Sequence, residues 1–566
     1  MIAGIDLGTT NSLIGVMESG FPILLADSGG RRLLPSAVRF DETGAPIVGW
    51  DALAGRDQAV TSVKRLIGVR VGESAPVPFQ VGKTGEPVRL LVGGQERSPE
   101  EISAIILENL KARAEAALSS KIERVVITVP AYFNDAQRSA TKRAGELAGL
   151  IVERLLPEPT AAALAFGLGK LGDRSRVAVF DLGGGTFDIS ILDLQEGVFH
   201  VLATQGDTRL GGDDFDAAIA REFQIPIAEA EALKRDTALT ADQQTRIHKV
   251  CQPILERTRR HCERAMLDAG IQTSDLNEVI LVGGATRMLG VRKFVAGVFG
   301  REPNTSQHPD EAVAMGAVIQ AGILEGSVQN VTLLDVTPLS LGIETFGGLM
   351  NIIIPRNTTI PVKAGEMFTN AVTNQTGMRI SVLQGEREMA SDNWKLGEFA
   401  VDFPPMPKGQ ARVGVQFEID ANGILHVLAR DTANGKDTTL ELSSAVDVSD
   451  EALEKMLADS LEHAFEDMDD RQFAEAKLKA DEMLPAIEVA LASVEVDPSE
   501  LQAIRDAEQA VRRAIENRSL QKLKSSLARL DDATQSLAAK LMEKAMSSAD
   551  ENSRNRVGSP GARQKK

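Results

Sequence analysis

The sequence is poor in cysteine and has no long hydrophobic run. Among its 566 residues only Cys251 and Cys262 are cysteines, too few for a disulfide framework or a cysteine-built metal site, so both are expected to be structural. No run approaches the ~20 apolar residues of a membrane-spanning helix, and the first residues lack the basic and apolar segments of a secretory signal. We therefore expect a cytoplasmic protein of bacterial type.

Positive charge is also scarce. Lysine and arginine number 62 against 80 aspartates and glutamates, which gives a formal net charge of -18. Such a chain repels phosphate backbones and anionic lipids, so nucleic-acid or membrane binding is excluded as its main activity. A nucleotide would need a local site. The length is too great for one hydrophobic core and predicts three or four domains.

The sequence pattern changes three times along the chain. Residues 1–326 alternate β-branched runs with helical patterns, which indicates an α/β domain. Residues 327–335 form a candidate linker whose apolar end could dock. Short strands with turn signals indicate an all-β domain over residues 336–446. Helical patterns follow over residues 447–546, and the unpatterned residues 547–566 predict a disordered tail.

The strongest local signal is a pair of similar segments, IDLGTTNS at residues 5–12 and FDLGGGTFD at residues 180–188. Each is typical of a strand, a turn and a second strand. Glycines and small hydroxyl residues let backbone N–H groups approach phosphate oxygens, and the aspartate ending the first strand can hold hydrated Mg²⁺. One such turn could be a plain hairpin, but the matched pair predicts a nucleotide clamped between two lobes.

Further motifs in one order extend the pattern: SVKRLIG, VITVPAYFND, PEPTAAALAFG, GDTRLGGDDFD, VGGATRM, PDEAVAMGA, DVTPLSLGIET, NTTIP and IDANGIL. Over residues 2–546 the sequence resembles the heat shock protein 70 (DnaK) family. The resemblance implies a multidomain α/β plus all-β plus α protein, with an actin-like two-lobed ATPase, a β-sandwich that binds peptides, and a C-terminal helical lid. It also implies a chaperone that uses ATP and Mg²⁺, with K⁺ as a second ion.

The resemblance further implies the residues of the ATPase site. Lys64 would contact the γ-phosphate and the attacking water, and Glu158 and Asp207 would orient that water or take its proton, with Thr186 as a further catalytic residue. The implied nucleotide-binding residues are Asp6, Gly8, Thr9, Thr10, Asn11, Asp181, Gly183, Gly184, Gly185, Gly211, Gly212, Gly283, Gly284, Arg287 and Asp310. The implied metal-site residues are Asp6, Asp181, Asp207 and Asp214. Taken alone, each acid could be an ordinary surface charge.

The same resemblance places a peptide groove in the β-domain. The implied groove residues are Ile343, Thr345, Phe346, Phe368, Ala371, Met378 and Ile380. From sequence alone, ordinary sandwich core explains these residues better, and Phe346 and Met378 depart from the residues common in the family. Lys408 matches a basic latch for an acid on the lid. The lid helices would equally fit a dimerisation arm, although we expect a monomer.

Three residues match the relay between nucleotide and partner domain: Pro130, Arg138 and Arg154. Arg154 corresponds to the arginine that meets a J-domain co-chaperone, although Pro157 replaces the usual asparagine nearby. Pro130 alone could simply end a strand.

One stretch is short. Gly211 to Gly284 spans 74 residues, whereas the family spends several tens more on a β-containing subdomain. We expect weaker nucleotide binding, quick exchange and little dependence on an exchange factor. Glu231 and Lys234 keep an E-x-x-K spacing that could be its remnant. The linker sequence NVTLL also lacks the longer aliphatic run of the family, so coupling could be weaker.

Three functions compete. The first is an ATP-dependent chaperone for short extended hydrophobic segments. The second is an ATP-independent holdase with a degenerate ATPase lobe, and the third is an actin-like small-molecule kinase, which would not explain the domains after Asp335. Within the family, the segments LADSGGRRLLPS and AAKLMEKAM are most similar to the HscA-type branch. That branch implies an iron–sulfur scaffold protein as client.

Overall fold

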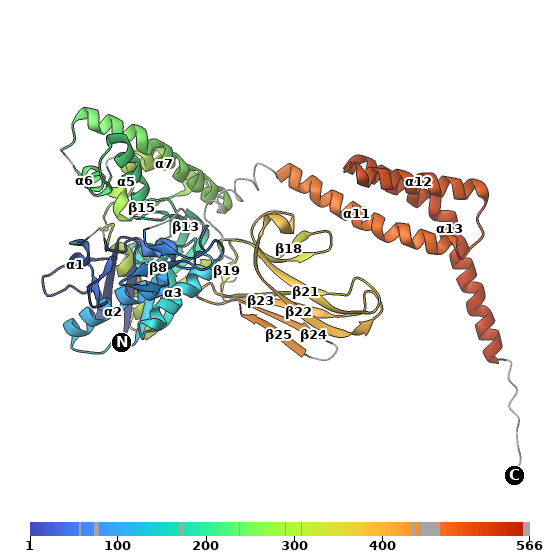
Figure 1. Cartoon of the computed structure of the whole chain (residues 1–566), viewed down its shortest axis with the longest axis horizontal. Coiled ribbons are helices and arrows are strands. Elements are labelled where there is room, and N and C mark those ends of the chain that lie inside the picture. Colours follow the sequence, from blue (N-terminus) through green and yellow to red (C-terminus); the bar gives the residue numbers. More distant parts are fainter. Residues whose placement is uncertain are drawn as a thin grey trace, which may run out of the picture. The chain divides into compact units, whose positions relative to one another are not determined.

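The computed structural model describes residues 1–55, 58–72, 78–168, 174–236, 238–288, 290–306, 308–432, 436–441 and 464–557. They form two compact units. The first unit holds both α/β sheets and most of the β-domain, and the second holds the C-terminal helices with residues 343–351 and 386–393 (Figure 1). Among the described residues, no helix has the length and apolarity needed to cross a bilayer.

The first sheet of the α/β region contains the first phosphate-type turn. Its strands, in pairing order, are β11 (Ile151–Pro157), β10 (Arg124–Val129), β1 (Ile2–Leu7), β2 (Asn11–Glu18) and β3 (Phe21–Leu24). The short strand β4 (Leu34–Pro35) also pairs with β2. Strand β1 runs parallel to β10 and antiparallel to β2. The strands bury long apolar runs because helices cover the sheet, among them α2 (Pro99–Leu118) and α3 (Asp135–Leu147).

The second sheet repeats this arrangement. Its strands, in pairing order, are β15 (Glu278–Val282), β12 (Ser175–Leu182), β13 (Phe187–Gln195), β14 (Val198–Asp207), β16 (Thr332–Val336) and β19 (Thr359–Ile360). Here too an antiparallel hairpin, β12–β13, stands beside a parallel strand, β15. Helices α4 (Glu158–Gly167) and α9 (Ala312–Glu325) share a core with residues of both sheets. The predicted alternation of strands and helices is confirmed.

The short stretch between β14 and β15 is helical. It consists of α5 (Gly212–Phe223), α6 (Ile227–Arg235) and α7 (Ala241–Asp268), followed by one 3-10 turn. No strand occurs among its described residues, in agreement with the expected loss of β structure (Figure 1). Thr240 caps α7 by accepting the N–H of Gln243, whose side chain accepts the N–H of Thr240 in return. This reciprocal cap fixes the start of α7 at Ala241.

The second half of the candidate linker, residues 332–335, lies in strand β16 (Thr332–Val336). Within β16, Leu333 aligns with Phe199 of β14 in parallel register, and Asp335 aligns with Ile360 of β19 in antiparallel register. Val331 is buried and Leu333 is partly buried against the core shared by the two sheets. The linker thus joins a strand of the α/β region to a strand of the β-domain.

The β-domain consists of two antiparallel sheets, as predicted. One sheet is ordered β18 (Leu349–Ile354), β17 (Leu341–Thr345), β21 (Gln375–Gln384) and β22 (Trp394–Met406). The other is ordered β20 (Val362–Phe368), β23 (Val413–Ile419), β24 (Leu425–Asp431) and β25 (Lys436–Glu441). Alternate residues of β23 are buried, as expected for a strand with one face on a core. Residues 442–446 of the predicted domain lie outside the described residues.

Three helices form most of the second unit: α11 (Ala464–Leu491), α12 (Pro498–Glu516) and α13 (Leu520–Val557). Their apolar faces share one core. Pro498 starts α12, as its position after Asp497 predicts. The expected disordered tail is wrong for residues 547–557, which continue α13. The remaining tail residues and residues 447–463 of the predicted lid lie outside the described residues.

Candidate functional site

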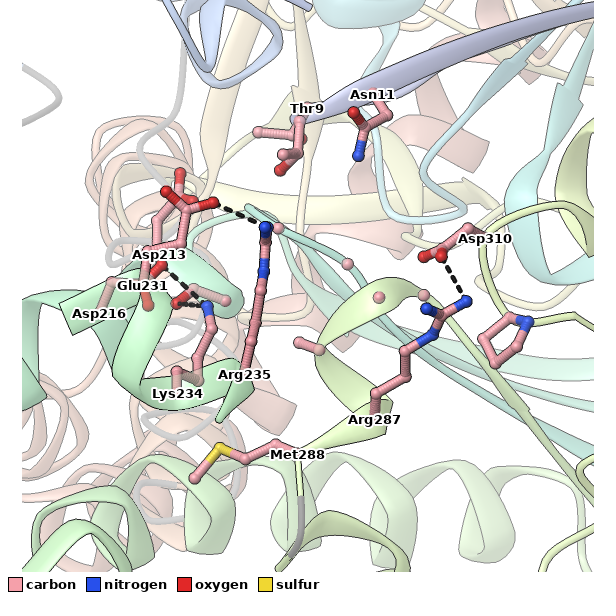
Figure 2. A pocket seen from close by; sticks show the side chains of 18 of the residues that line it. Thr9, Asn11, Asp213, Asp216, Glu231, Lys234, Arg235, Arg287, Met288 and Asp310 are labelled. Carbon is pink, nitrogen blue, oxygen red and sulfur yellow. Dashed lines mark hydrogen bonds and ion pairs between the residues drawn. The ribbon is translucent and has the colours of Figure 1, made fainter. Parts of the chain in front are cut away.

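A cavity of about 1390 Å³ opens between the two sheets and helices α5, α6 and α7 (Figure 2). Its size exceeds that of most small-molecule pockets, which measure roughly 300–1,000 Å³. The wall also contains the 3-10 turn η5 (Gly284–Arg287) and α8 (Val291–Phe299). The predicted site residues that line it are Asp6, Gly8, Thr9, Thr10, Asn11, Glu158, Asp181, Gly183, Gly184, Thr186, Gly212, Gly283, Gly284, Arg287 and Asp310.

The two glycine-containing turns lie against each other in the wall of this cavity. A Cβ on Gly184 would lie 1.9 Å from Thr10 Oγ1, and a Cβ on Gly8 would lie 2.1 Å from the carbonyl oxygen of Asn11. Any larger residue would therefore collide with the opposite turn or with its own. The start of α5 supports the second turn, because the N–H of Gly212 donates to the carbonyl of Gly183 at 2.9 Å. The close backbones form a cradle that suits phosphate oxygens.

Buried carboxylates gather beside the turns. Burial raises the pKa of Asp6 to about 7, with repulsion from Glu158 as the next cause, while Thr128 Oγ1 donates to Asp6 Oδ1 at 2.9 Å. Burial and then Glu158 likewise raise the pKa of Asp181. They also raise the pKa of Asp188 to about 8. This cluster of carboxylates would be stabilised by a cation.

Asp188 was not among the predicted site residues. It is only 1% exposed, and the backbone N–H of Tyr132 donates to its Oδ1 at 3.2 Å. It ends the segment FDLGGGTFD, so its position in that motif was the available signal. The structure adds it to the acidic group of the site.

Lys64 enters the same group from the other side. It lies in the 3-10 helix η2 (Val63–Leu66), is buried, and donates through its ammonium group to Glu158 Oε1. Glu158 is the first residue of α4, directly after Pro157. The predicted lysine and glutamate are thus brought together as a buried ion pair, in which Glu158 lines the cavity and Lys64 does not.

The carboxylates fit a hydrated divalent cation. Among the described residues, no three His, Cys, Asp or Glu side chains are placed to ligate one metal ion directly. Mg²⁺ commonly keeps several waters and is held by one or two carboxylates and by phosphates. Asp6 and Asp181 both line the cavity beside the cradle, so their oxygens suit Mg²⁺ carried by a nucleotide.

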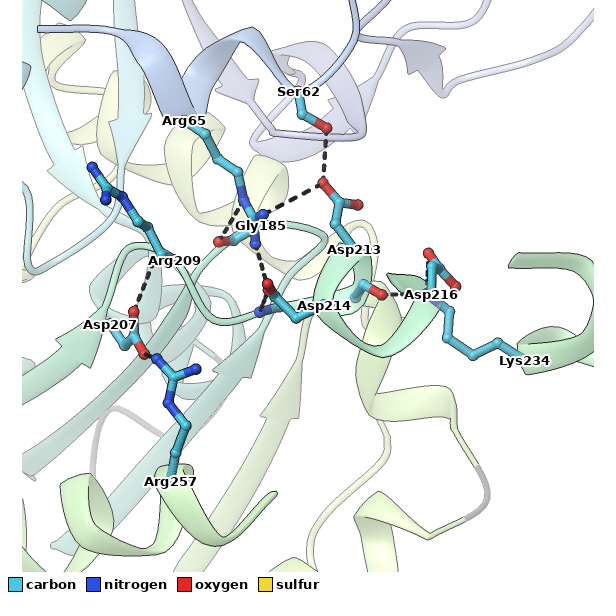
Figure 3. Close-up of polar contacts among 12 residues, drawn as sticks. Ser62, Arg65, Gly185, Asp207, Arg209, Asp213, Asp214, Asp216, Lys234 and Arg257 are labelled. Carbon is cyan, nitrogen blue, oxygen red and sulfur yellow. Dashed lines mark hydrogen bonds and ion pairs between the residues drawn. The ribbon is translucent and has the colours of Figure 1, made fainter. Parts of the chain in front are cut away.

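Two predicted metal-site residues are engaged elsewhere (Figure 3). Asp207 accepts hydrogen bonds from Arg257 Nη2 at 2.6 Å and from the N–H of Arg209 at 2.8 Å. Asp214 Oδ2 accepts from Arg65 Nη2 at 2.6 Å and from the N–H of Gly211 at 2.8 Å. Arginine and backbone donors thus hold both carboxylates, and neither lines the cavity. Their expected roles at the metal and the water stay predictions.

Two predicted glycines, Gly185 and Gly211, are not among the residues that line the cavity. A Cβ on Gly211 would lie 2.6 Å from the nitrogen of Gly185. Both therefore support the second turn and do not line the cavity themselves.

Charged pairs also line the cavity. Arg287 forms an ion pair with Asp310 at 2.6 Å, and its guanidinium is about half exposed (Figure 2). From α6, Lys234 donates to Asp216 at 2.8 Å and to the carbonyl of Gly212 at 2.9 Å. Glu231 and Lys234, the possible remnant of the missing subdomain, thus both line the cavity.

A neighbouring pair on α6 and an indole complete this wall. Arg235 pairs with Glu231 at 2.7 Å, a contact that sequence reasoning missed although the four-residue spacing on a helix allowed it. Trp50 also lines the cavity, is 44% exposed, and has the guanidinium of Arg31 5.7 Å from its ring centre.

Comparison with protein families identifies the chain. The family model described as Hsp70 protein matches residues 2–237 and 220–543. The chain belongs to the Hsp70 family. Members of this family are ATPases that use Mg²⁺ and act as chaperones, in general binding unfolded peptides and J-domain co-chaperones. The two matched segments overlap at residues 220–237, within the stretch that is short in this Hsp70.

The predicted relay residues lie between the first sheet and the linker of this Hsp70. Arg138 is buried and donates to the carbonyls of Phe133 and Ala131, both at 3.0 Å, while Pro130 follows β10 and accepts the N–H of Phe133 at 3.2 Å. Burial lowers the pKa of Arg138 and of Arg154, and the carboxylate of Asp335 opposes that shift in both. The negative charge of the linker aspartate therefore stabilises the charged form of both arginines.

The predicted groove residues divide between the two units. Ile343, Thr345 and Phe346 belong to the second unit, and Phe368, Ala371, Met378 and Ile380 belong to the first. Ile343 and Ile380 are buried, whereas Phe346 is 60% exposed. Burial of the two isoleucines agrees with the sandwich-core interpretation for these positions. Their role toward a peptide stays a prediction.

The expected latch at Lys408 has a counterpart within the second unit. Arg387 donates two hydrogen bonds to Asp467 of α11, at 2.6 and 2.8 Å, and both side chains are largely buried. Lys408 itself donates its backbone N–H to Thr373 Oγ1 at 3.2 Å. A loop of the β-domain thus carries the basic partner of the helices at Arg387.

Proposed function

We propose that this Hsp70 hydrolyses ATP at the cavity between the two sheets and uses hydrolysis to retain short extended hydrophobic peptides. The observation that carries this proposal is the pair of facing turns, together with the Lys64–Glu158 ion pair and the carboxylates of Asp6, Asp181 and Asp188 beside them. A phosphate cradle alone would serve binding. A buried lysine next to a carboxylate adds the groups that hydrolysis needs.

Each group has a distinct chemical role in this proposal. The glycine turns and Thr9 and Thr10 hold phosphate oxygens by hydrogen bonding. Asp6 and Asp181 hold the hydrated Mg²⁺, which supplies neutralisation of charge on the transferring group. Lys64 stabilises that charge from the opposite side, and Glu158 orients the attacking water or takes its proton.

The docked linker supports coupling to peptide binding. Strand β16 hydrogen-bonds to β14 of the nucleotide-binding region and to β19 of the β-domain. A nucleotide-dependent shift between the docked and released linker would change the affinity for peptide, and by linkage peptide would change the affinity for nucleotide. The helices after residue 447 act as the lid in this proposal.

The partners follow from the same proposal. A J-domain co-chaperone would bind near Arg154, and the client would be an extended segment, including one from an iron–sulfur scaffold protein. The proposed compartment is the cytoplasm. A passive holdase is the second candidate, because the nucleotide-binding region is shortened between β14 and β15.

Steady-state ATP hydrolysis tests the proposal. The protein is assayed alone and with a J-domain protein plus a peptide, taken either from an iron–sulfur scaffold or from an unrelated hydrophobic sequence. Lys64→Ala should abolish turnover while the surface control Lys121→Ala leaves it unchanged. Stimulation by the scaffold peptide alone would support the specialised role. Peptide binding without any ATP hydrolysis would overturn the ATPase proposal and leave the holdase.

A further inference from the structure

The short helix η2 sends two neighbouring side chains to opposite sides. Lys64 donates to Glu158. Arg65 instead reaches the second glycine turn and α5, as Figure 3 shows. The residue before the helix, Ser62, has a φ of +52° and donates through Oγ to Asp213 at 2.8 Å. Residues on both sides of Lys64 are therefore hydrogen-bonded to α5, Ser62 through Asp213 and Arg65 through Asp214.

The contacts of Arg65 are made by its whole guanidinium group. Its Nε donates to the carbonyl of Gly185 at 3.0 Å, and its Nη2 donates to Asp214 Oδ2 at 2.6 Å. The Arg65 side chain is 20% exposed and the Asp214 side chain 31%. A planar guanidinium can satisfy both acceptors at once, which a lysine ammonium cannot do in the same geometry.

Arg65 also packs tightly against the turn that it holds. A Cβ on Gly185 would lie 2.6 Å both from Arg65 Nε and from Thr9 Cγ2. The second turn is thus enclosed between Arg65 on one side and the first turn on the other. If Arg65 moved or were shortened, the Gly185 peptide would lose its fixed neighbour and its hydrogen bond.

We propose that Arg65 is a positioning residue for phosphoryl transfer, with Asp214 as its anchor on α5. Arg65 fixes the Gly183–Thr186 turn relative to Lys64, although the turn joins two strands of the second sheet and Lys64 lies in η2. The inference rests on the proposed ATP hydrolysis. The inference also gives Asp214 a function other than metal binding. Its carboxylate accepts a hydrogen bond from the Arg65 guanidinium, which in turn donates to the carbonyl of Gly185.

The proposal predicts a loss in rate more than in substrate affinity. A displacement of about 1 Å at a reacting group can cost on the order of 100-fold in rate. We expect Arg65→Ala to lower kcat by roughly 10- to 100-fold, with a smaller rise in KM, since the other turn and Asp6 still bind the nucleotide. Arg65→Lys should recover part of kcat because it keeps one charged donor.

A double-mutant cycle tests the coupling. Arg65→Ala, Asp214→Ala and the double variant are measured by single-turnover hydrolysis of ATP and by the dissociation rate of a fluorescent ADP analogue. The double variant should be about as slow as Arg65→Ala alone, because Asp214 acts on the turn through Arg65. The matched control is Arg124→Ala, which breaks the exposed Arg124–Glu153 pair of the first sheet, 2.5 Å long, and should leave both rates unchanged.

The outcomes separate this inference from the proposed function. Wild-type hydrolysis with unchanged rates in Arg65→Ala, or additive effects in the cycle, would overturn the positioning role. If wild type does not hydrolyse ATP, the proposed function fails, and the ADP dissociation rate alone tests the role of Arg65. Faster ADP dissociation in Arg65→Ala would support the inference that Arg65 holds the turn. An unchanged dissociation rate would overturn that inference. If Arg65→Ala does not fold, Arg65→Lys and Asp214→Asn give the same readouts in folded protein, as checked by urea unfolding.

Discussion

The carbonyl of Asn422, in the turn between β23 and β24, accepts a hydrogen bond from Arg138 Nη1 at 3.1 Å. The side-chain oxygen of the same asparagine accepts the N–H of Leu155 at 2.9 Å. Nearby, Asp135 Oδ1 accepts the N–H of Leu425 at 2.8 Å. One turn of the β-domain is thus held by three groups around the first sheet of the α/β region.

Substitution of Asn422 should weaken this contact. Asn422→Ala leaves the N–H of Leu155 without its acceptor, at a cost of about 1–3 kcal/mol. We expect ATP to release a labelled peptide less effectively from the variant, because the docked arrangement that ATP would favour is less stable. Stopped-flow release of a fluorescent peptide measures this effect. Asn422→Asp keeps an acceptor oxygen and should behave more like wild type.

Asp188 should make the nucleotide-free protein less stable at higher pH. Its pKa is raised from 3.8 to about 8, so the folded state binds this proton more tightly than the unfolded state between these values. Stability is therefore lost as the pH rises toward 8. Burial raises the pKa of Asp6 to about 7 and acts in the same direction.

Asp188→Asn tests this linkage. The urea midpoint of nucleotide-free wild type should fall from pH 6 to pH 8, and the variant should fall less and be more stable at pH 8. ATP hydrolysis by the variant should fall, because the acidic group beside the hydrated Mg²⁺ loses one carboxylate. Equal pH slopes for the two proteins would contradict the raised pKa.

The linker strand should depend on Leu333. Leu333→Asp puts a charge against the core that Leu333 covers, which favours the released linker. We expect faster hydrogen exchange at the amides of residues 332–336 and loss of peptide stimulation of ATP hydrolysis, with basal hydrolysis retained. Thr332 is exposed, so Thr332→Asp is the control. Unchanged exchange in Leu333→Asp would argue against docking through this side chain.

The Arg387–Asp467 pair should slow peptide release if the helices act as a lid. Arg387→Ala leaves a largely buried carboxylate without its partner, which typically costs about 3–5 kcal/mol for a buried pair. We expect peptide dissociation from the ADP form to accelerate by 10-fold or more. Arg379→Ala is the control, since Arg379 is 75% exposed in its pair with Glu398. An unchanged dissociation rate in Arg387→Ala would exclude this pair as a latch.

Much of the fold follows from local sequence. Buried β-branched runs and helical patterns identify the α/β region, because strand and helix periodicities differ. The facing turns were predictable from Gly8 and Gly184, since the matched motifs need backbone without side chains at those points. The sequence of the linker did not predict whether it docks. In the structure the linker strand β16 pairs with β14.

The roles of the aspartates were harder to assign. Asp207 and Asp188 are both buried acids near the second turn, yet Asp207 is neutralised by Arg257, fifty positions later in the chain. Spacing cannot reveal such a long-range partner. The end of α13 was also missed, because serine- and asparagine-rich composition favours disorder on average while residues 547–557 continue the preceding helix.

The chain has only two tryptophans, and they lie in different domains. Trp50 lines the cavity and is partly exposed, and Trp394 begins β22. Indole emission changes with its solvent exposure, so a Trp394→Phe variant would give an optical signal from the cavity alone, and Trp50→Phe one from the β-domain alone. This Hsp70 thus carries its own pair of spectroscopic reporters, and the order of events in its two domains can be timed without attached labels.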